Sequence, residues 1–246
     1  TGSGKTTTLY STLRQLATPE ANFCTIEDPI EMVEGALKQM QVKHGINLDF
    51  SAGVRALMRQ DPDIIMVGEI RDLETANMAV QAALTGHLVF STLHTVSAVA
   101  TANRLFDMGA PGYLIAAALH SIIAQRLVRR VCETCAEPAV LTDGQTAWLR
   151  AQLGDNETDT YDFKHGRGCN YCHLSGYRGR IGVYELLEMD GPLTDALRRE
   201  DLGEFTALAG EKESYVPLVN CALDYARQGI TSIDEVIRVV GGLDGN

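Results

Sequence analysis

The spacing of apolar residues along this chain follows two patterns, which together predict an α/β fold. The unbroken apolar run over residues 64–67 is typical of a strand that is buried on both faces of a sheet. Leu9, Leu13 and Leu16 have the spacing of a helix that packs one face against such a sheet. We therefore expect an open sheet with helices between its strands.

In the first half of the chain, predicted strands and helices alternate. Strands are expected over residues 22–26, 35–42, 63–67 and 87–92, and the last of these is expected to be buried. Helices are expected over residues 9–17, 71–84 and 97–108, from an N-cap at Ser51, and from Pro111 towards Gln125.

In the second half, the pattern predicts a polar insert, one strand and four short helices. The insert covers residues 142–163, as a hairpin or a small helix anchored by Trp148, and the basic, glycine-rich stretch 177–185 becomes a strand. The helices cover residues 193–200, 205–208, 216–228 and 233–240; Gly229 caps the third, Thr231 and Ser232 begin the fourth, and a tail starts at Gly241. These features predict an α/β core over 1–130, a cysteine-containing element over 131–184 and a helical region over 185–246.

Composition narrows the class of protein. The chain has 246 residues, of which 45% are hydrophobic and 22% charged, so we expect a packed core in one large domain or one domain with a small appendage. The net charge of -11 argues against a surface that binds duplex nucleic acid. No apolar run reaches the roughly 18 residues of a membrane-spanning helix.

The beginning of the chain has the sequence of a phosphate-binding loop that leads into a helix. Gly2 and Gly4 permit tight backbone conformations that point several N–H groups into one concavity. Lys5 is expected to reach the outer phosphates of ATP, and the Thr6 hydroxyl to bind Mg²⁺. The complete set of expected nucleotide-binding residues is Gly2, Ser3, Gly4, Lys5, Thr6 and Thr7.

The first glycine of the usual motif, and the strand that precedes it, are not in the sequence. We therefore expect a fragment of a longer protein, or a gene model that starts too late. The alternative interpretation is a glycine- and serine-rich terminal linker. A linker of that kind does not lead into Lys5 and then a helical apolar stripe.

Acidic residues follow two of the predicted strands. Glu27 and Glu31 come after the strand over 22–26, and on their own they fit a solvated turn, as does Pro29. Facing a phosphate loop, they become candidates to bind magnesium or to orient an attacking water. Glu69 follows the strand over 63–67, where an acid commonly holds magnesium, here through water because Gly68 stands where an Asp is often found.

His87 and His94 bracket the strand predicted over 87–92. One histidine near a strand is most often structural. Two at the ends of one strand in this sheet favour contact with phosphate, or coupling of the phosphate to a neighbouring subunit.

Four of the six cysteines form two C-x-x-C pairs. The pairs are Cys132 with Cys135 and Cys169 with Cys172, separated by more residues than in a compact zinc ribbon. Each pair can direct two thiolates at one tetrahedral metal, and a closed site of four sulfurs favours zinc. A redox pair and buried free thiols are the alternatives; neither requires two such pairs.

Four motifs in this order make the chain resemble the C-terminal ATPase domain of the type II secretion and type IV pilus assembly ATPases (the GspE/PilB type). They are residues 2–6 (Walker A), 25–31 (the Asp box), 63–69 with Arg71 and Asp72 (an atypical Walker B) and 86–95 (the His box). The resemblance covers nearly the whole chain. Gly68 before Glu69 is usual in that family, and the four cysteines resemble the zinc-binding part of its assembly members.

The resemblance implies a RecA-like P-loop ATPase core that acts in a homohexamer. It implies that Glu31 positions or activates water, that Glu69 holds magnesium, and that His87 and His94 lie near the γ-phosphate. It also implies a cytoplasmic location at the inner face of the bacterial inner membrane, with peripheral association through an inner-membrane platform protein. Because family members carry a further N-terminal domain that supplies arginines to the neighbour's site, the chain alone is expected to hydrolyse ATP weakly.

The motifs are compatible with three functions. The resemblance favours a motor that uses ATP to drive pilin or pseudopilin polymerisation and protein export. A RecA-like nucleic-acid translocase is an alternative, which the acidic balance disfavours. A zinc-stapled scaffold that senses ATP without hydrolysing it is another, which the intact Lys5, Glu31 and Glu69 disfavour.

Overall fold

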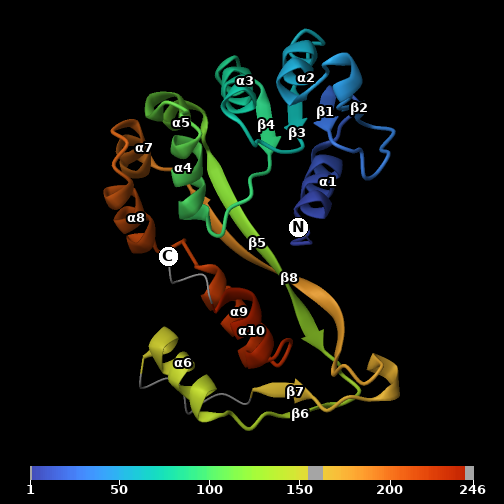
Figure 1. Ribbon diagram of the computed structural model, residues 1–246, viewed down its shortest axis with the longest axis vertical. Helices are drawn as coiled ribbons and strands as arrows, with labels where there is room; N and C mark the ends of the chain where they lie inside the picture. The colour runs from blue at the N-terminus through green and yellow to red at the C-terminus, as the bar shows by residue number, and fades with distance from the viewer. Residues whose placement is uncertain (1, 155–162, 242–246) are drawn as a thin grey trace. The chain divides into compact units, whose positions relative to one another are not determined.

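The computed structural model describes residues 2–154 and 163–241 (Figure 1). They form two compact units. The first, the sheet unit, contains Lys5–Ile122 and Leu187–Tyr215; the second, the cysteine unit, contains the residues up to Gly4, Ile123–Leu186 and the chain from Val216 on. The division into parts at residues 130 and 184 stays a prediction.

The sheet unit contains a parallel sheet of four strands in the order β2-β1-β3-β4. The strands are β1 (Phe23–Glu27), β2 (Lys38–Gln41), β3 (Ile64–Val67) and β4 (Leu88–Ser91). Because all four run in the same direction, the segments that follow them begin at one edge of the sheet, which is where open α/β sheets bind ligands.

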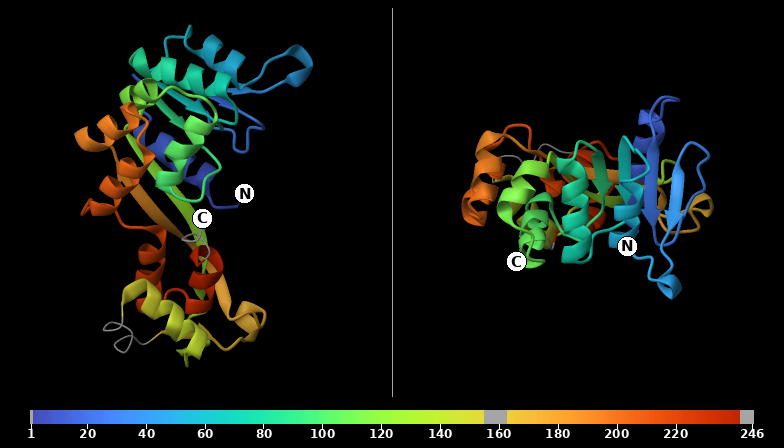
Figure 2. Two further views of the ribbon diagram at one scale, coloured as in Figure 1. Left: turned by 60° about the vertical axis from the view of Figure 1, so that its left-hand side comes forward. Right: turned by 90° about the horizontal axis from the view of Figure 1, so that it is seen from above.

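Helices cover both faces of this sheet. Helix α1 (Lys5–Leu16) lies on one face, where Tyr10 and Leu13 pack with Phe23 and Met66. Helices α2 (Phe50–Leu57) and α3 (Leu73–Leu84) lie together on the other face (Figures 1 and 2).

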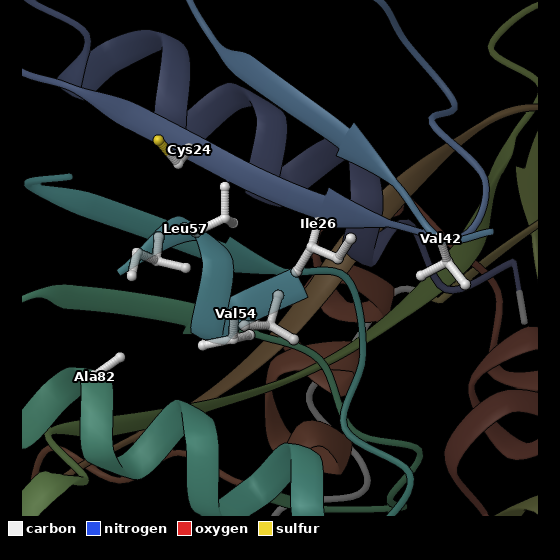
Figure 3. Close-up of a cluster of buried hydrophobic side chains, with 8 residues drawn as sticks. Cys24, Ile26, Val42, Val54, Leu57 and Ala82 are labelled. Carbon is white, nitrogen blue, oxygen red and sulfur yellow. The ribbon is translucent and has the colours of Figure 1, made fainter. Parts of the chain in front are cut away.

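The cluster beneath α2 and α3 explains the apolar runs in the sequence (Figure 3). Cys24 and Ile26 of β1, and Ile65 and Val67 of β3, point into it with Val54, Leu57 and Ala82, whereas the alternate residues of both strands face α1. Both strands therefore bury both faces, which requires apolar residues in succession.

Four further helices complete the sheet unit. They are α4 (Ala98–Asp107), α5 (Gly112–Ala118), α7 (Gly191–Arg198) and α8 (Leu202–Glu211). Gly112 donates its N–H to Glu200 at 2.9 Å and has no space for a side chain, because a Cβ there would lie 2.5 Å from the carbonyl oxygen of Leu197. The start of α5 is thereby fixed against the end of α7.

The cysteine unit is built on two pairs of strands. Strand β5 (Ser121–Val131), which begins in the sheet unit, pairs with β8 (Tyr177–Glu188), and β6 (Ala136–Pro138) pairs antiparallel with β7 (Lys164–Gly166). Its helices are α6 (Asp143–Leu153), α9 (Leu218–Arg227) and α10 (Ile233–Val240). Among the described residues, 3₁₀ turns cover His44–Ile46 in the sheet unit and Asn170–Cys172 in the cysteine unit. Within the described ranges, no helix has the length and apolarity needed to cross a bilayer.

Three local predictions were wrong. The N-cap of α2 is Asp49, which accepts the N–H of Ala52 at 2.8 Å, whereas Ser51 lies inside the helix and donates to Glu74. Strand β4 is not fully buried, because it is the outermost strand of the described sheet and has a neighbouring strand on one side only.

The third error concerns the segment after Pro111, where the predicted helix ends at Ala118 and β5 begins at Ser121. Short apolar runs do not distinguish a strand from a helix by spacing alone.

The polar insert is helical over α6, where Thr142 forms a capping box with Gln145. Trp148 is only partly buried, and the neighbouring Leu149 is the buried residue of this helix. The rest of the insert, over 155–162, lies outside the described residues, as does the predicted tail beyond Gly241.

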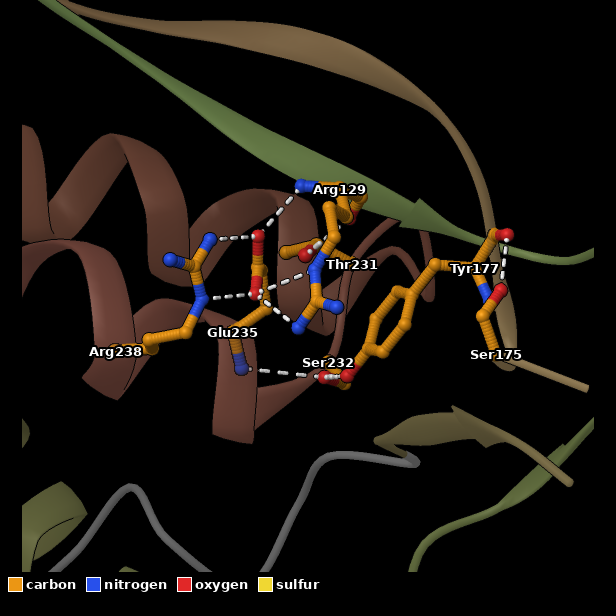
Figure 4. A network of polar contacts seen from close by, with 7 residues as sticks. All are labelled: Arg129, Ser175, Tyr177, Thr231, Ser232, Glu235 and Arg238. Atoms are coloured by element: carbon orange, nitrogen blue, oxygen red, sulfur yellow. Dashed lines mark hydrogen bonds and ion pairs between the residues drawn. The ribbon is translucent and has the colours of Figure 1, made fainter.

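A buried carboxylate joins β5 to α10 in the cysteine unit (Figure 4). Glu235 is 0% exposed and accepts hydrogen bonds from the guanidinium groups of Arg129 and Arg238 at 2.6–2.9 Å. The Arg129 guanidinium lies 4.0 Å from the centroid of the Tyr177 ring, whose hydroxyl is 2.6 Å from Ser232. Burial raises the pKa of Glu235, but the hydrogen bonds from the two arginines outweigh it and lower the pKa to about 2.

This carboxylate should make stability depend on pH. A group whose pKa is lower in the folded protein stabilises it above its ordinary pKa of 4.5 and loses that effect as the pH falls towards 2. We expect a contribution of about 3 kcal/mol to the free energy of unfolding. Urea unfolding of Glu235→Gln should therefore show lower stability at pH 7 and a smaller further loss at pH 3, whereas Glu133→Gln, at an exposed position of the same unit, should behave like the parent. Equal acid sensitivity in both variants and the parent would contradict this.

Candidate functional site

The phosphate loop has the backbone conformation expected for it. Gly2 and Gly4 have φ angles of 79° and 84°, and α1 begins at Lys5, directly after the loop. A Cβ at position 4 would lie 2.8 Å from Nε2 of Gln125, so that side chain would have to shift, and the positive φ angle would strain any residue other than glycine there. Ser3 and Thr6 are partly buried, Thr7 is exposed, and Thr1 lies outside the described residues.

Lys5 links the start of α1 to the segment after β4. Its Nζ donates to the carbonyl oxygen of Leu93 at 2.8 Å. Leu93 precedes His94, so one hydrogen bond joins the expected phosphate-binding lysine to the segment that carries one of the expected histidines.

Glu69 lies directly beyond the carboxyl end of β3 and is the centre of a charged cluster. Its side chain is 11% exposed, and its Oε2 lies 2.6 Å from Nε of Arg71 and 3.3 Å from Nε2 of His94. The sequence placed Arg71 at the start of a helix and in the atypical Walker B motif, but gave it no role. Its ion pair gives Glu69 a cationic partner within the chain.

Packing explains why Gly68 stands in the position where many such motifs have an Asp. A Cβ at residue 68 would lie 3.3 Å from the carbonyl oxygen of Ile26 and 3.4 Å from Cα of Glu27. An Asp would therefore push against the backbone of β1. Glu69 is left as the acid that can hold a cation at the end of β3.

Glu27 is buried at the end of β1, with a relative exposure of 4%. Tyr10 donates to its Oε2 at 2.5 Å, while Thr25 and Gln39 donate to its Oε1 at 2.6 and 3.2 Å. Burial, and then the hydrogen bond to Glu27, raise the pKa of Tyr10 well above its usual value, so its hydroxyl remains a donor. The carboxylate of Glu27 is thus engaged in holding α1, β1 and β2 together.

Glu31 differs from Glu27 in its exposure, its position and its hydrogen bonding. It is exposed and lies four residues beyond the end of β1, and in the described part of the chain its carboxylate makes no hydrogen bond or ion pair. A carboxylate in this state is available to accept a hydrogen bond from water.

The structure does not bring His87 together with these groups. Its Nδ1 lies 2.9 Å from the carbonyl oxygen of Ala82 and 3.1 Å from Oγ1 of Thr85, at the end of α3. His87 precedes β4, so it is at the opposite edge of the sheet from Glu69 and His94. A role near the γ-phosphate stays a prediction for His87, and this position does not favour it.

Within the sheet unit, Lys5 is therefore connected through Leu93 to His94 and its partner Glu69. Glu27 ends the neighbouring strand β1, and Glu31 follows that strand, at the same edge. The sequence interpretation missed Tyr10 and Gln39. One signal was available for Tyr10: it lies in the apolar stripe of α1, and a buried tyrosine hydroxyl requires a partner. No local signal identifies Gln39.

The four cysteines of the two C-x-x-C pairs come together in the cysteine unit as one cluster. Their Sγ atoms all lie within 4.8 Å of one another, with separations of 4.0 Å for Cys132 and Cys169 and of 3.8 Å for Cys135 and Cys172. Four sulfurs bound to one tetrahedral zinc at about 2.3 Å are separated by about 3.8 Å. The donor set therefore fits a closed zinc site in both its chemistry and its spacing.

Backbone groups support the cluster. The N–H groups of Cys169 and Gly176 donate to Sγ of Cys172 at 3.2 and 3.3 Å. They lower the pKa of Cys172 to about 6, whereas burial raises the pKa of Cys135 to about 12. Donors that point at a sulfur favour its thiolate form, which is the form that binds metals.

Comparison with known proteins gives a consistent result. The model of the family described as "Type II/IV secretion system protein" matches residues 1–238. Over 98% of its length, the chain is 51% identical to the type IV pilus assembly ATPase TfpB of Acinetobacter baylyi and covers 41% of that protein. It is 45% identical over 97% of its length to the type II secretion system ATPase E of Vibrio cholerae and covers 46% of it.

Solved structures agree with the fold. The ATPase DotB of Legionella pneumophila superimposes with a TM-score of 0.70 at 28% identity, covering 98% of this chain and 58% of that one. The pilus retraction motor PilT, solved with bound ADP, gives 0.67 at 27% identity, covering 97% and 58%. The α/β fold with a parallel sheet is therefore confirmed.

The chain spans about half the length of the curated relatives that it matches. The family model covers nearly all of the chain, and the phosphate loop, the acids after β1 and β3 and the cysteine cluster all lie within the matched residues. The chain thus belongs to the type II/IV secretion system protein family, whose relatives named above are secretion and pilus ATPases.

Proposed function

We propose that this chain is the ATP-hydrolysing part of a hexameric motor that powers pilin or pseudopilin polymerisation and protein export. The observation that supports this most lies at the carboxyl edge of the parallel sheet, where His94 pairs with Glu69 and Lys5 donates to the carbonyl of Leu93, the residue before His94. Exposed Glu31 follows the next strand. A phosphate-binding lysine, an acid for magnesium and an acid for water are the groups that phosphoryl transfer to water requires.

The proposed roles follow from these positions. Residues 2–7 hold the phosphates of ATP, and the N-terminus of α1 lies behind them. Thr6 and Glu69 would hold magnesium, which would supply neutralisation of the phosphate charge when bound. Glu31 orients the attacking water and takes up its proton, while Glu27 supports this site through its buried hydrogen bonds.

Zinc is the proposed metal of the cysteine cluster, as its sulfur spacing supports. The proposed partners are further copies of the chain and an inner-membrane platform protein, at the cytoplasmic face of that membrane. These proposals are supported by the relatives, which are named as a pilus assembly ATPase and a secretion system ATPase.

Lys5→Ala should weaken ATP binding about 100-fold, because the phosphates lose their main cationic partner. Binding of a fluorescent ATP analogue in the presence of magnesium measures this. Lys43→Ala, which removes an exposed lysine of the same unit, should retain the parent affinity. Unchanged affinity in Lys5→Ala would refute the assignment of the loop.

ATP turnover by the protein at its full cellular length tests the function itself. Magnesium-dependent phosphate release that is absent from Lys5→Ala supports a motor. ATP binding without turnover supports a scaffold instead, and DNA binding that weakens steeply with salt supports a translocase.

A further inference from the structure

The loop that carries Glu31 is anchored on both sides of that residue. We call residues 28–34 the Glu31 loop. On the preceding side, Ile30 donates its N–H to Oε1 of Gln41 at 3.2 Å. On the following side, the carbonyl oxygen of Met32 accepts from Nε2 of Gln39 at 2.9 Å and lies 3.0 Å from the hydroxyl of Tyr10. Glu31 itself has no anchor in the described residues, so these bonds determine where its carboxylate can reach.

Gln39 is the central member of these anchors. Its Nε2 lies within 2.9–3.2 Å of the Tyr10 hydroxyl, of Oε1 of Glu27 and of the Met32 carbonyl, and its Oε1 accepts the N–H of Glu34 at 2.8 Å. The side-chain amide of Gln39 therefore joins β2 to the buried carboxylate of Glu27 and to both ends of segment 32–34, which follows Glu31.

Tyr10 connects the same network to Lys5, the first residue of α1. It lies on α1 five residues after Lys5, which is about 7.5 Å along a helix. Its ring is 0% exposed, and its hydroxyl donates to Glu27. A displacement of α1 would therefore be transmitted to the Glu31 loop through groups that are packed and hydrogen-bonded.

We infer that Tyr10 and Gln39 are positioning residues, which act through Glu27 and the Glu31 loop to hold Glu31 in register with Lys5 at the start of α1. The inference rests on the proposed role of Glu31. Neither residue contacts the reacting atoms. Their loss should lower the rate, because a displacement of about 1 Å in a catalytic group is sufficient to lower it about 100-fold.

The first test is a double-mutant cycle on ATP turnover, in the protein at its full cellular length. Tyr10→Phe removes only the hydroxyl and should lower kcat about 10- to 100-fold with little change in ATP affinity. Added to Glu31→Gln, it should cause no further loss, because there is no longer a base to position. Tyr113→Phe, at a position that is 61% exposed, should leave kcat unchanged.

The second test measures the loop itself, by amide hydrogen exchange of the peptide that covers residues 28–34. Gln39→Glu removes the donors to Met32 and Glu27 but retains an acceptor for Glu34. Exchange should become faster in this variant and kcat should fall. Gln81→Glu, at an exposed position, is the matched control for both readouts.

The outcomes separate this inference from the proposed function. Losses that multiply in the double variant, or an exchange rate that Gln39→Glu leaves unchanged, would overturn the positioning role even where Glu31→Gln is inactive. Normal turnover in Glu31→Gln would overturn the role of Glu31. Faster exchange with normal turnover would show that the network holds the loop without serving the reaction, and would overturn the inference as well.

Discussion

Glu31→Gln is expected to lower the rate of ATP hydrolysis about 1000-fold while ATP affinity stays within about threefold of the parent. The amide has the shape of the carboxylate but cannot take up a proton from water. Because Glu31 is exposed and makes no bond within the described residues, its replacement should not disturb the fold or the phosphate loop. The loss should therefore appear in kcat alone.

Phosphate release and binding of a slowly hydrolysed ATP analogue measure the two quantities separately. Glu20→Gln serves as control, since Glu20 is an exposed acid of the same unit. Hydrolysis at the parent rate in Glu31→Gln would exclude Glu31 as the base. A loss of both affinity and rate would place Glu31 among the groups that bind the nucleotide or its magnesium.

Cys169→Ser is expected to eliminate bound zinc, from about one ion per chain in the parent, and to expose residues 131–184 to proteolysis. A closed zinc site contributes its binding free energy to folding, on the order of 10 kcal/mol in small zinc-dependent domains. Cys169 is the least buried of the four, and its sulfur lies 3.8–4.0 Å from two of the others, so its loss would leave the cluster with three thiolates.

Elemental analysis of protein purified under reducing conditions without chelator, followed by limited proteolysis, checks both effects. Cys221→Ser removes a thiol of the same unit that lies on α9 outside the cluster, and it should keep the metal and the protection. If the parent protein contained no metal, the four cysteines would be free thiols and the zinc assignment would be wrong. Unchanged protection in Cys169→Ser would show that folding of this region does not depend on the metal.

Features whose cause lies within a few neighbouring residues could be predicted from the sequence. The apolar run of β3 reports burial on both faces, and Gly2 and Gly4 indicated the tight backbone conformation that precedes α1. The two C-x-x-C pairs predicted one cluster, because each pair fixes the direction of two sulfurs and a metal requires four.

Features that depend on tertiary packing could not be predicted in this way. Gln39 and Tyr10 are 29 residues apart and meet only because β2 and α1 flank β1. The segment after Pro111 has an apolar run that fits a helix or a strand, and pairing with β8 determines the outcome. His87 was grouped with His94 because both border β4, but the direction of that strand places them at opposite edges.

The hydrogen bond from Lys5 to the carbonyl of Leu93 gives the proposed phosphate-binding lysine a partner within its own chain. A phosphate that took over this N–H would displace the carbonyl, and the apparent affinity for ATP would then be lower than the intrinsic one by the fraction of time that the lysine is released. The same exchange would remove an anchor from the segment that carries His94. In the proposed motor, occupancy of the phosphate loop and freedom of this segment would therefore increase together.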